Sequence, residues 1–161
     1  MNIAKTIDHT LLKPEATAAD IQALCREAKQ YGFASVCVNT CYVKLAFELL
    51  RGSGVKVCCT VGFPLGAMAP KATAFEAAQA VADGAEDVDM VLWIGALRQG
   101  HTAALPADLE GRVTACHPRA IGKVILETCL VTDAQTEPAG RLGLGEGADC
   151  GNTPTGLSPA S

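Results

Sequence analysis

Aromatic residues and basic stretches are scarce in this chain of 161 residues. Phe, Trp and Tyr make up 4% of it, so the core must be built from Ala, Val, Leu and Ile. There is no stripe of Lys and Arg that could neutralise a run of phosphates, so we expect no nucleic-acid partner. No apolar run approaches the roughly 18 residues that a membrane span needs, and the first residues lack the apolar region of a secretory signal. We therefore expect a cytoplasmic protein with no membrane partner.

The chain also lacks the cysteine spacing of a zinc site. It contains eight cysteines but no C-x-x-C pair. Their share of the sequence lies below the roughly 8–10% that marks a disulfide scaffold. Most of them lie inside apolar runs, so we predict buried, reduced thiols and no metal site.

The main pattern along the sequence is a series of short apolar runs that alternate with helix-like stretches. Hydrophobic residues make up 49% of the chain and charged residues 19%, as expected for one globular domain. A spacing of about 28 residues between the apolar runs indicates strand–crossover–strand units with parallel strands. The predicted strands are Ile7–Leu11, Ala34–Val38, Val55–Val61, Asp87–Leu92 and Lys123–Glu127, with a weaker sixth near Ala148–Thr153.

The helix signals weaken toward the end of the chain. Pro106 and Gly111 are expected to interrupt the helix over Leu105–Cys116. Pro138 and three glycines fall in Asp133–Glu146, where together they would cost a helix roughly 6 kcal/mol. We therefore expect poor order from about residue 134 onward.

The strand count indicates an α/β fold of the TIM (β/α)8 type that is incomplete. Such a barrel normally needs about 250 residues and eight strands. Five to six of the eight units are present here, so one copy is expected to leave open sheet edges. Open edges favour pairing with another chain. A homo-oligomer, or pairing with a full-length relative, is the expected form of association.

Six phrases of the sequence resemble the deoxyribose-phosphate aldolase family. The resemblance is nearly continuous from Ile7 to about Gly100, blurred to residue 120, clear again over 122–132 and fragmentary afterwards. The phrases are IDHTLLKP (Ile7–Pro14), YGFASVCVN (Tyr31–Asn39), VGFPLG (Val61–Gly66), VDMV (Val88–Val91), IGAL (Ile94–Leu97) and KVILET (Lys123–Thr128). We therefore expect a single domain over 1–161. Its sequence is family-like over 1–132, and the family pattern is degraded over 133–161.

The resemblance implies a β/α barrel and a carbon–carbon lyase. The family cleaves 2-deoxyribose 5-phosphate reversibly into glyceraldehyde 3-phosphate and acetaldehyde. It uses no metal and no organic cofactor, because a lysine amine forms an imine with the carbonyl carbon. An aspartate and a second lysine handle the protons. A small phosphorylated sugar is the partner that this resemblance implies.

Asp89 corresponds to the family's proton-relay aspartate. The residues themselves agree with a position inside the barrel, because Val88, Met90 and Leu92 share the strand face suited to packing on helices. Asp89 lies on the opposite face, where a carboxylate must be solvated, paired or functional. A structural salt bridge is the alternative interpretation.

The family's nucleophilic lysine does not carry over. The family phrase Gly-Ala-Asp-Phe-Val-Lys-Thr-Ser-Thr-Gly-Phe aligns without a gap on GADCGNTPTGL (Gly147–Leu157), and Asn152 occupies the lysine position. Gly151 and Pro154 replace two further residues of the motif, and both changes weaken a strand. By the resemblance, the second lysine and most phosphate-binding loops belong to the last two units of the barrel.

Lys123 is the best candidate for a substitute amine, followed by Lys13. Lys123, Ile125 and Glu127 alternate onto one strand face, but the pKa of Lys123 would have to be lowered and no adjacent cation is evident. A solvated or salt-bridged lysine is the alternative.

Two further positions belong to the substrate pocket by resemblance. Cys37 matches a cysteine near the pocket, with a core thiol as the alternative, and Asp8 matches a position at the barrel mouth.

The sequence as a whole predicts an aldolase-like chain that does not catalyse the family reaction. The alternative is a non-catalytic interaction module that pairs through its open barrel edge.

Overall fold

A computed structural model describes residues 2–100, 103 and 105–152 of the chain. These residues contain a sheet of six parallel strands whose order in space follows their order in the sequence. The strands are β1 (Asp8–Leu11), β2 (Ser35–Asn39), β3 (Lys56–Val61), β4 (Asp87–Val91), β5 (Ile121–Ile125) and β6 (Cys150–Asn152). The predicted parallel strands are confirmed, including the weak sixth. The fifth begins and ends two residues earlier than predicted.

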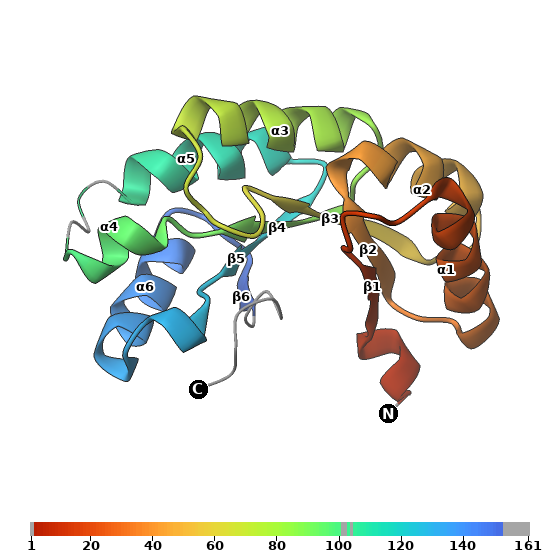
Figure 1. Cartoon of the computed structure of the whole chain (residues 1–161), viewed down its shortest axis with the longest axis horizontal. Coiled ribbons are helices and arrows are strands. Elements are labelled where there is room, and N and C mark those ends of the chain that lie inside the picture. The colour runs from red at the N-terminus through yellow and green to blue at the C-terminus, as the bar shows by residue number, and fades with distance from the viewer. Residues whose placement is uncertain (1, 101–102, 104, 153–161) are drawn as a thin grey trace.

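Six α-helices connect the strands and cover one face of the sheet, which curves as part of a barrel wall (Figure 1). Within the described residues, β1 pairs only with β2 and β6 only with β5. The helices are α1 (Ala18–Tyr31), α2 (Val43–Leu50), α3 (Pro70–Ala82), α4 (Ile94–Arg98), α5 (Leu105–Cys116) and α6 (Asp133–Gly145). The fold is a partial TIM-type barrel, as predicted.

The predicted signals set the ends of α1. Asp20 at the third helical position accepts a hydrogen bond from the backbone N–H of Thr17, and the Thr17 hydroxyl accepts one from the backbone N–H of Asp20. Gly32 ends the helix in the left-handed conformation, with φ of 66°, which glycine adopts without a steric penalty. The capping box and the glycine stop are therefore confirmed.

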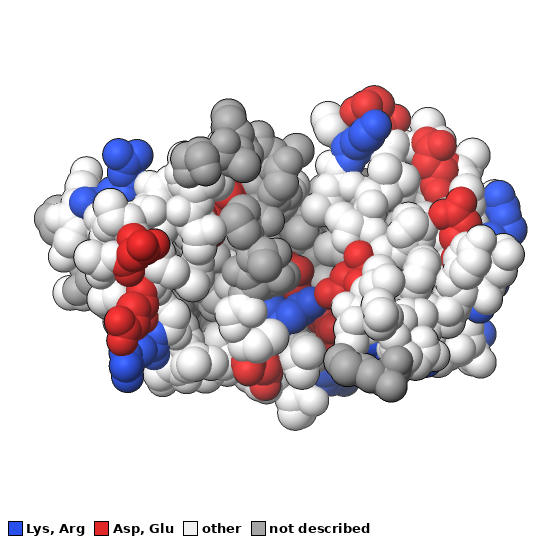
Figure 2. Space-filling view, turned by 90° about the horizontal axis from the view of Figure 1, so that it is seen from below, with Lys and Arg blue, Asp and Glu red and all other residues white. Residues whose placement is uncertain are grey.

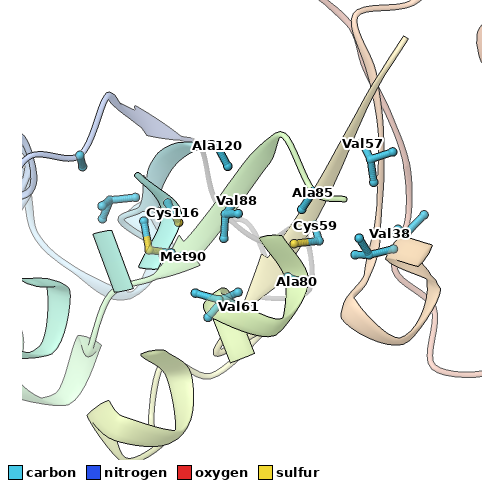
Figure 3. Close-up of a cluster of buried hydrophobic side chains, with 14 of the residues drawn as sticks. Val38, Val57, Cys59, Val61, Ala80, Ala85, Val88, Met90, Cys116 and Ala120 are labelled. Carbon is cyan, nitrogen blue, oxygen red and sulfur yellow. The ribbon is translucent and has the colours of Figure 1, made fainter. Parts of the chain in front are cut away.

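The main core lies between the sheet and the helices (Figure 3). Alternate residues of β2, β3 and β4 point into it, because successive side chains of a strand face opposite sides. Val88, Met90 and Leu92 belong to this core, as predicted for that face of β4. The other strand residues in it include Val36, Val38, Val57, Cys59, Val61 and Val124.

The expected interruption of α5 is wrong. Pro106 is the second residue of the helix, where its missing N–H would have had no helical partner. Gly111 lies where α5 meets α3, and a Cβ there would come within 3.3 Å of the Ala74 Cβ. The glycine allows close packing of the two helices rather than breaking one of them.

The expected disruption of the helix at Asp133–Glu146 is also wrong. The structure has a helix over Asp133–Gly145 with Pro138 inside it. Gln135 accepts a hydrogen bond from the backbone N–H of Thr132 at the start of this helix. Gly143 is buried against the sheet, where a Cβ would lie 3.5 Å from Val124. Packing on the sheet thus outweighs the poor helix propensity of these residues. That residues 133–161 are poorly ordered stays a prediction.

Five of the eight cysteines are buried, as the sequence predicted for most of them. None of the described helices has both the length and the apolar character needed to cross a lipid bilayer.

Candidate active site

Polar side chains gather on the face of the sheet opposite the helices, which we call the concave face. In a complete barrel this face would line the interior. Thr60 of β3 pairs with Asp89 of β4, which pairs with Lys123 of β5, so these residues stand at one level on three neighbouring strands. Figure 2 views the molecule from this side and shows basic and acidic side chains in contact near the centre of the face.

Lys123 is at the centre of this group. Its Nζ lies 2.9 Å from Asp89 Oδ1, 3.2 Å from Asp8 Oδ2 and 3.8 Å from Asp87 Oδ2. The Sγ of Cys58 lies 3.8 Å from the same nitrogen. The sequence suggested this lysine as a substitute amine, and the structure surrounds it with carboxylates from β1 and β4.

These carboxylates decide the charge of Lys123. Burial by itself would lower the pKa of the ammonium group, but Cys58 and the carboxylates of Asp89 and Asp8 raise that pKa above its usual range. An opposite charge within about 4–6 Å favours the charged form of a group. Lys123 is therefore an ammonium ion at neutral pH. An imine requires the neutral amine, so this environment opposes the nucleophilic role.

Asp89 is buried beside this ammonium group. Burial raises the pKa of the Asp89 carboxyl, while the charge of Lys123 and hydrogen bonds from Lys123 and Cys58 act in the opposite direction. A carboxyl group with a raised pKa binds a proton more readily than an exposed one, which suits an acid–base role. The geometry thus allows Asp89 to act as a proton relay, and equally provides the structural salt bridge named as its alternative.

Asp8 and Asp87 link the cluster to neighbouring strands. Asp8 Oδ1 accepts a hydrogen bond from the Ser35 hydroxyl at 2.6 Å, and Asp87 Oδ1 lies 3.1 Å from Lys56 Nζ. Asp8 is the first residue of β1 and meets Lys123 across the concave face, although 115 positions separate them in the sequence. Lys13, the second candidate amine, is exposed in the loop after β1.

Two cysteines stand beside the charged residues. Cys37 pairs with Cys58 across β2 and β3, and both are buried. A hydrogen bond with Cys37, together with burial, raises the pKa of the Cys58 thiol well above its ordinary value. The Cys58 thiol is therefore neutral at neutral pH. The sequence predicted the position of Cys37 in the pocket, but gave Cys58 and Thr60 no role. The strand period could have placed both on the concave face once the register was known.

Asn152 is the last residue of β6, and its backbone pairs with Ile125 of β5. The residues Thr153–Ser161, which include the end of the aldolase-like motif, lie outside the described part of the chain. Glu127 does not continue the face of Lys123 and Ile125, because β5 ends at Ile125. Glu127 instead has a left-handed backbone with φ of 46°, is buried, and accepts a hydrogen bond from the Cys129 thiol at 2.8 Å.

Comparison with known proteins gives relatives that share one name, deoxyribose-phosphate aldolase. No family model matches the chain. Deoxyribose-phosphate aldolase 1 of Bacillus licheniformis is 52% identical over 156 residues, which cover 97% of this chain and 70% of that protein. The deoxyribose-phosphate aldolase of Geobacillus sp. is 51% identical over 157 residues, 98% of this chain and 70% of the relative.

Solved structures show the same similarity. A Coccidioides immitis protein provisionally identified as a deoxyribose-phosphate aldolase superimposes with a TM-score of 0.95 at 38% identity, covering 98% of this chain and 62% of that one. The deoxyribose phosphate aldolase of Aeropyrum pernix gives a TM-score of 0.88 at 33% identity, covering 96% and 65%. The chain thus spans about 70% of the length of the curated relatives and somewhat less of these two structures. With half of its residues identical to relatives that it covers to more than two thirds, and with their fold, the chain belongs to the deoxyribose-phosphate aldolase family.

Proposed function

We propose that this chain is an aldolase-type protein that does not catalyse cleavage of 2-deoxyribose 5-phosphate, although it retains part of the site for that reaction. The proposal depends on one observation: the family motif places Asn152 where the imine-forming lysine stands. The nitrogen of a carboxamide is delocalised into its carbonyl and is not a nucleophile. Carbonyl activation through an imine requires a primary amine at this position.

The other amine on the concave face does not replace the missing one. Lys123 would have to lose a proton before it could attack a carbonyl carbon, and three aspartates lie within 4 Å of its nitrogen. Their charges hold the pKa of Lys123 above its usual range. A nucleophilic lysine needs the opposite environment, apolar or next to another cation.

The retained part of the site is the proton-handling part. We assign Asp89 as the relay aspartate, supported by its burial and its 2.9 Å contact with Lys123. Asp8 and Cys37 would border the same pocket, as the resemblance implies. The family reaction itself would need no metal and no organic cofactor. The expected ligand of the site is a small phosphorylated sugar, and the expected location of the protein is the cytoplasm.

Borohydride trapping tests the proposal directly. The wild-type chain, incubated with acetaldehyde and sodium borohydride, should give no stoichiometric ethyl adduct on any lysine of the concave face. An adduct mapped by mass spectrometry to Lys123 would overturn the proposal.

Asn152→Lys is the matched positive control, because it returns an amine to the motif position. We expect this variant to give an adduct on residue 152, and Lys44→Arg, a change on exposed α2, to behave as wild type. If Asn152→Lys gives no adduct while remaining folded, the assignment of position 152 as the imine position is wrong.

A second candidate function is association through the sheet edges. It is supported by β1 and β6, each of which has one strand neighbour among the described residues. Edge strands present unpaired backbone groups that can pair with another chain. Light scattering on a size-exclusion column decides: a dimer or a mixed complex with a full-length relative supports this function, and a monomer at high concentration excludes it.

A further inference from the structure

We propose that Cys37, Cys58 and Asp89 form a binding site for a soft divalent metal ion such as Zn²⁺ or Cd²⁺. The two thiol sulfurs and one carboxylate oxygen lie within 4.8 Å of one another, and all three residues are buried. They come from β2, β3 and β4, three adjacent strands. The C-x-x-C spacing that marks many zinc sites in a sequence does not apply to donors that lie 21 and 31 positions apart along the chain.

The separation of the donors suits tetrahedral zinc. Zinc–sulfur bonds of about 2.3 Å at tetrahedral angles place two thiolate sulfurs roughly 3.8 Å apart. Cys37 and Cys58 are register partners on neighbouring parallel strands, and their sulfurs already lie within 4.8 Å of each other. A site with two thiolates and one carboxylate also binds Zn²⁺ and Cd²⁺ in preference to harder ions.

The hydrogen bonds of the three donors mark the place that a metal ion would take. Cys58 is hydrogen-bonded to both Cys37 and Asp89. A metal ion bound between the same atoms would replace the two thiol protons, which are released to solvent. Two protons leave for each divalent ion that enters, so the net charge of the buried cluster does not change.

Lys123 does not block this site. Its ammonium group contacts Asp89 through Oδ1, and Asp89 has a second oxygen. Lys123 also keeps Asp8 as a partner at 3.2 Å. Because the net charge of the cluster is the same with and without the ion, the ammonium group 3.8 Å from the Cys58 sulfur remains next to a negatively charged cluster.

Thr60 provides independent support for a ligand at this place. Its Oγ1 is buried and has no hydrogen-bond partner among the described residues, and the residue is 4% exposed. Buried hydroxyl groups are normally hydrogen-bonded, so an unpartnered one needs an explanation. Thr60 shares the concave face with Cys58, two residues earlier on β3, and pairs with Asp89. A water molecule in the fourth position of the metal would give this hydroxyl its partner.

Cobalt titration of the full chain tests the proposal without any aldehyde, so its result is independent of the imine experiment. Co²⁺ is the spectroscopic substitute for Zn²⁺. We expect one equivalent to produce thiolate-to-cobalt charge-transfer absorption and the visible bands of a tetrahedral site, both of which one equivalent of Zn²⁺ abolishes. No charge-transfer band at one equivalent would overturn the proposal.

Three variants assign the signal. Cys37→Ser should remove the charge-transfer band, whereas Cys41→Ser, at an exposed cysteine outside the cluster, should keep it. A band that survives Cys37→Ser with unchanged intensity would place the metal elsewhere and overturn the assignment. Thr60→Val keeps shape and folding, and should lower Zn²⁺ affinity about 10-fold or more, as loss of an outer-shell partner does. Unchanged affinity in that variant would overturn the role of Thr60.

Discussion

Lys123 Nζ and Asp89 Oδ1 lie 2.9 Å apart on paired positions of two neighbouring parallel strands. The two side chains are 9% and 7% exposed, so solvent screens their attraction little. Asp8 and Asp87 share the same ammonium group. One lysine therefore compensates several carboxylates on the concave face. Its loss would remove the ammonium partner of the buried Asp89, whereas Asp87 would keep Lys56.

Replacing Lys123 with Met should destabilise the chain by about 3–5 kcal/mol at neutral pH, the usual effect of removing one partner from a buried ion pair. Burial raises the pKa of Asp89, so acid protonates this carboxyl first and removes its uncompensated charge. The deficit of the variant should therefore shrink as the pH falls from about 7 to about 5. Urea denaturation of the wild type and the variant across this pH range measures the difference in unfolding free energy.

Lys44→Met, on the exposed side of α2, is the control and should change stability by no more than about 0.5 kcal/mol. Equal losses in the two variants would contradict the prediction.

Cys116 should make the chain less stable in alkaline solution. Burial raises the pKa of its thiol from 9.0 to about 11, with a further contribution from Asp149. The folded state keeps a proton that the unfolded chain releases, so the stability is complete below pH 9 and is lost as the pH rises through 11. A difference of this size corresponds to about 2–3 kcal/mol.

The Cys116→Ala variant should show a flatter decline of unfolding free energy over this pH range than the wild type. Cys41→Ala, at an exposed cysteine, should keep the wild-type slope. A Cys116→Ala slope that matches wild type would show that this thiol is not the group responsible.

Two Arg–carboxylate pairs of the same helical spacing should differ strongly in their contribution. Arg112 is 1% exposed, pairs with Asp108 and donates a hydrogen bond to the Val91 carbonyl at 2.8 Å. Arg112→Met leaves that carboxylate and that carbonyl buried without the guanidinium, at a cost of about 3–5 kcal/mol. Arg141 pairs with Glu137 at 78% and 72% exposure, and Arg141→Met should cost about 0.5 kcal/mol or less. Chemical denaturation of the two variants gives both numbers. Similar values for both would contradict a special contribution of the buried pair.

Helix α6 should respond to glycine replacement according to backbone conformation. Gly140 is inside the helix, and the nearest side-chain atom to an added Cβ would be Leu126 Cδ1 at 3.8 Å, an ordinary contact. Gly140→Ala should therefore stabilise the chain by about 1 kcal/mol. Gly147 follows the helix with φ of 89°, so Gly147→Ala should destabilise it by about 1–2 kcal/mol. Thermal unfolding separates the two, and a loss in Gly140→Ala would mean that this stretch is not helical in solution.

Much of the architecture could be predicted because it depends on local patterns. The period of two in β4 placed Asp89 on one face and Val88 and Met90 on the other, and the structure has this arrangement. Thr17 and Gly32 set the ends of a helix through contacts within a few residues. Such signals act over short stretches of chain, so the sequence contains them completely.

The misjudged helices show where local patterns are insufficient. Propensity counts treat Gly111 as a cost, but in the fold it lets α5 approach α3 where a Cβ would come within 3.3 Å of Ala74. Whether a small residue weakens a helix or improves its packing depends on what lies opposite. That information is not in the helix itself.

The sequence by itself determined the parallel α/β architecture and the family, and it predicts that Asn152 occupies the position of the motif lysine. Only the tertiary structure decided the state of Lys123, because Asp8 reaches it from the far end of the described sheet and holds it, with Asp89, as an ammonium ion. It alone also brought Cys37 and Cys58 to Asp89. The physical reason is that charge, pKa and metal affinity depend on distances of a few ångströms in space, and strand pairing sets those distances between residues far apart in the chain.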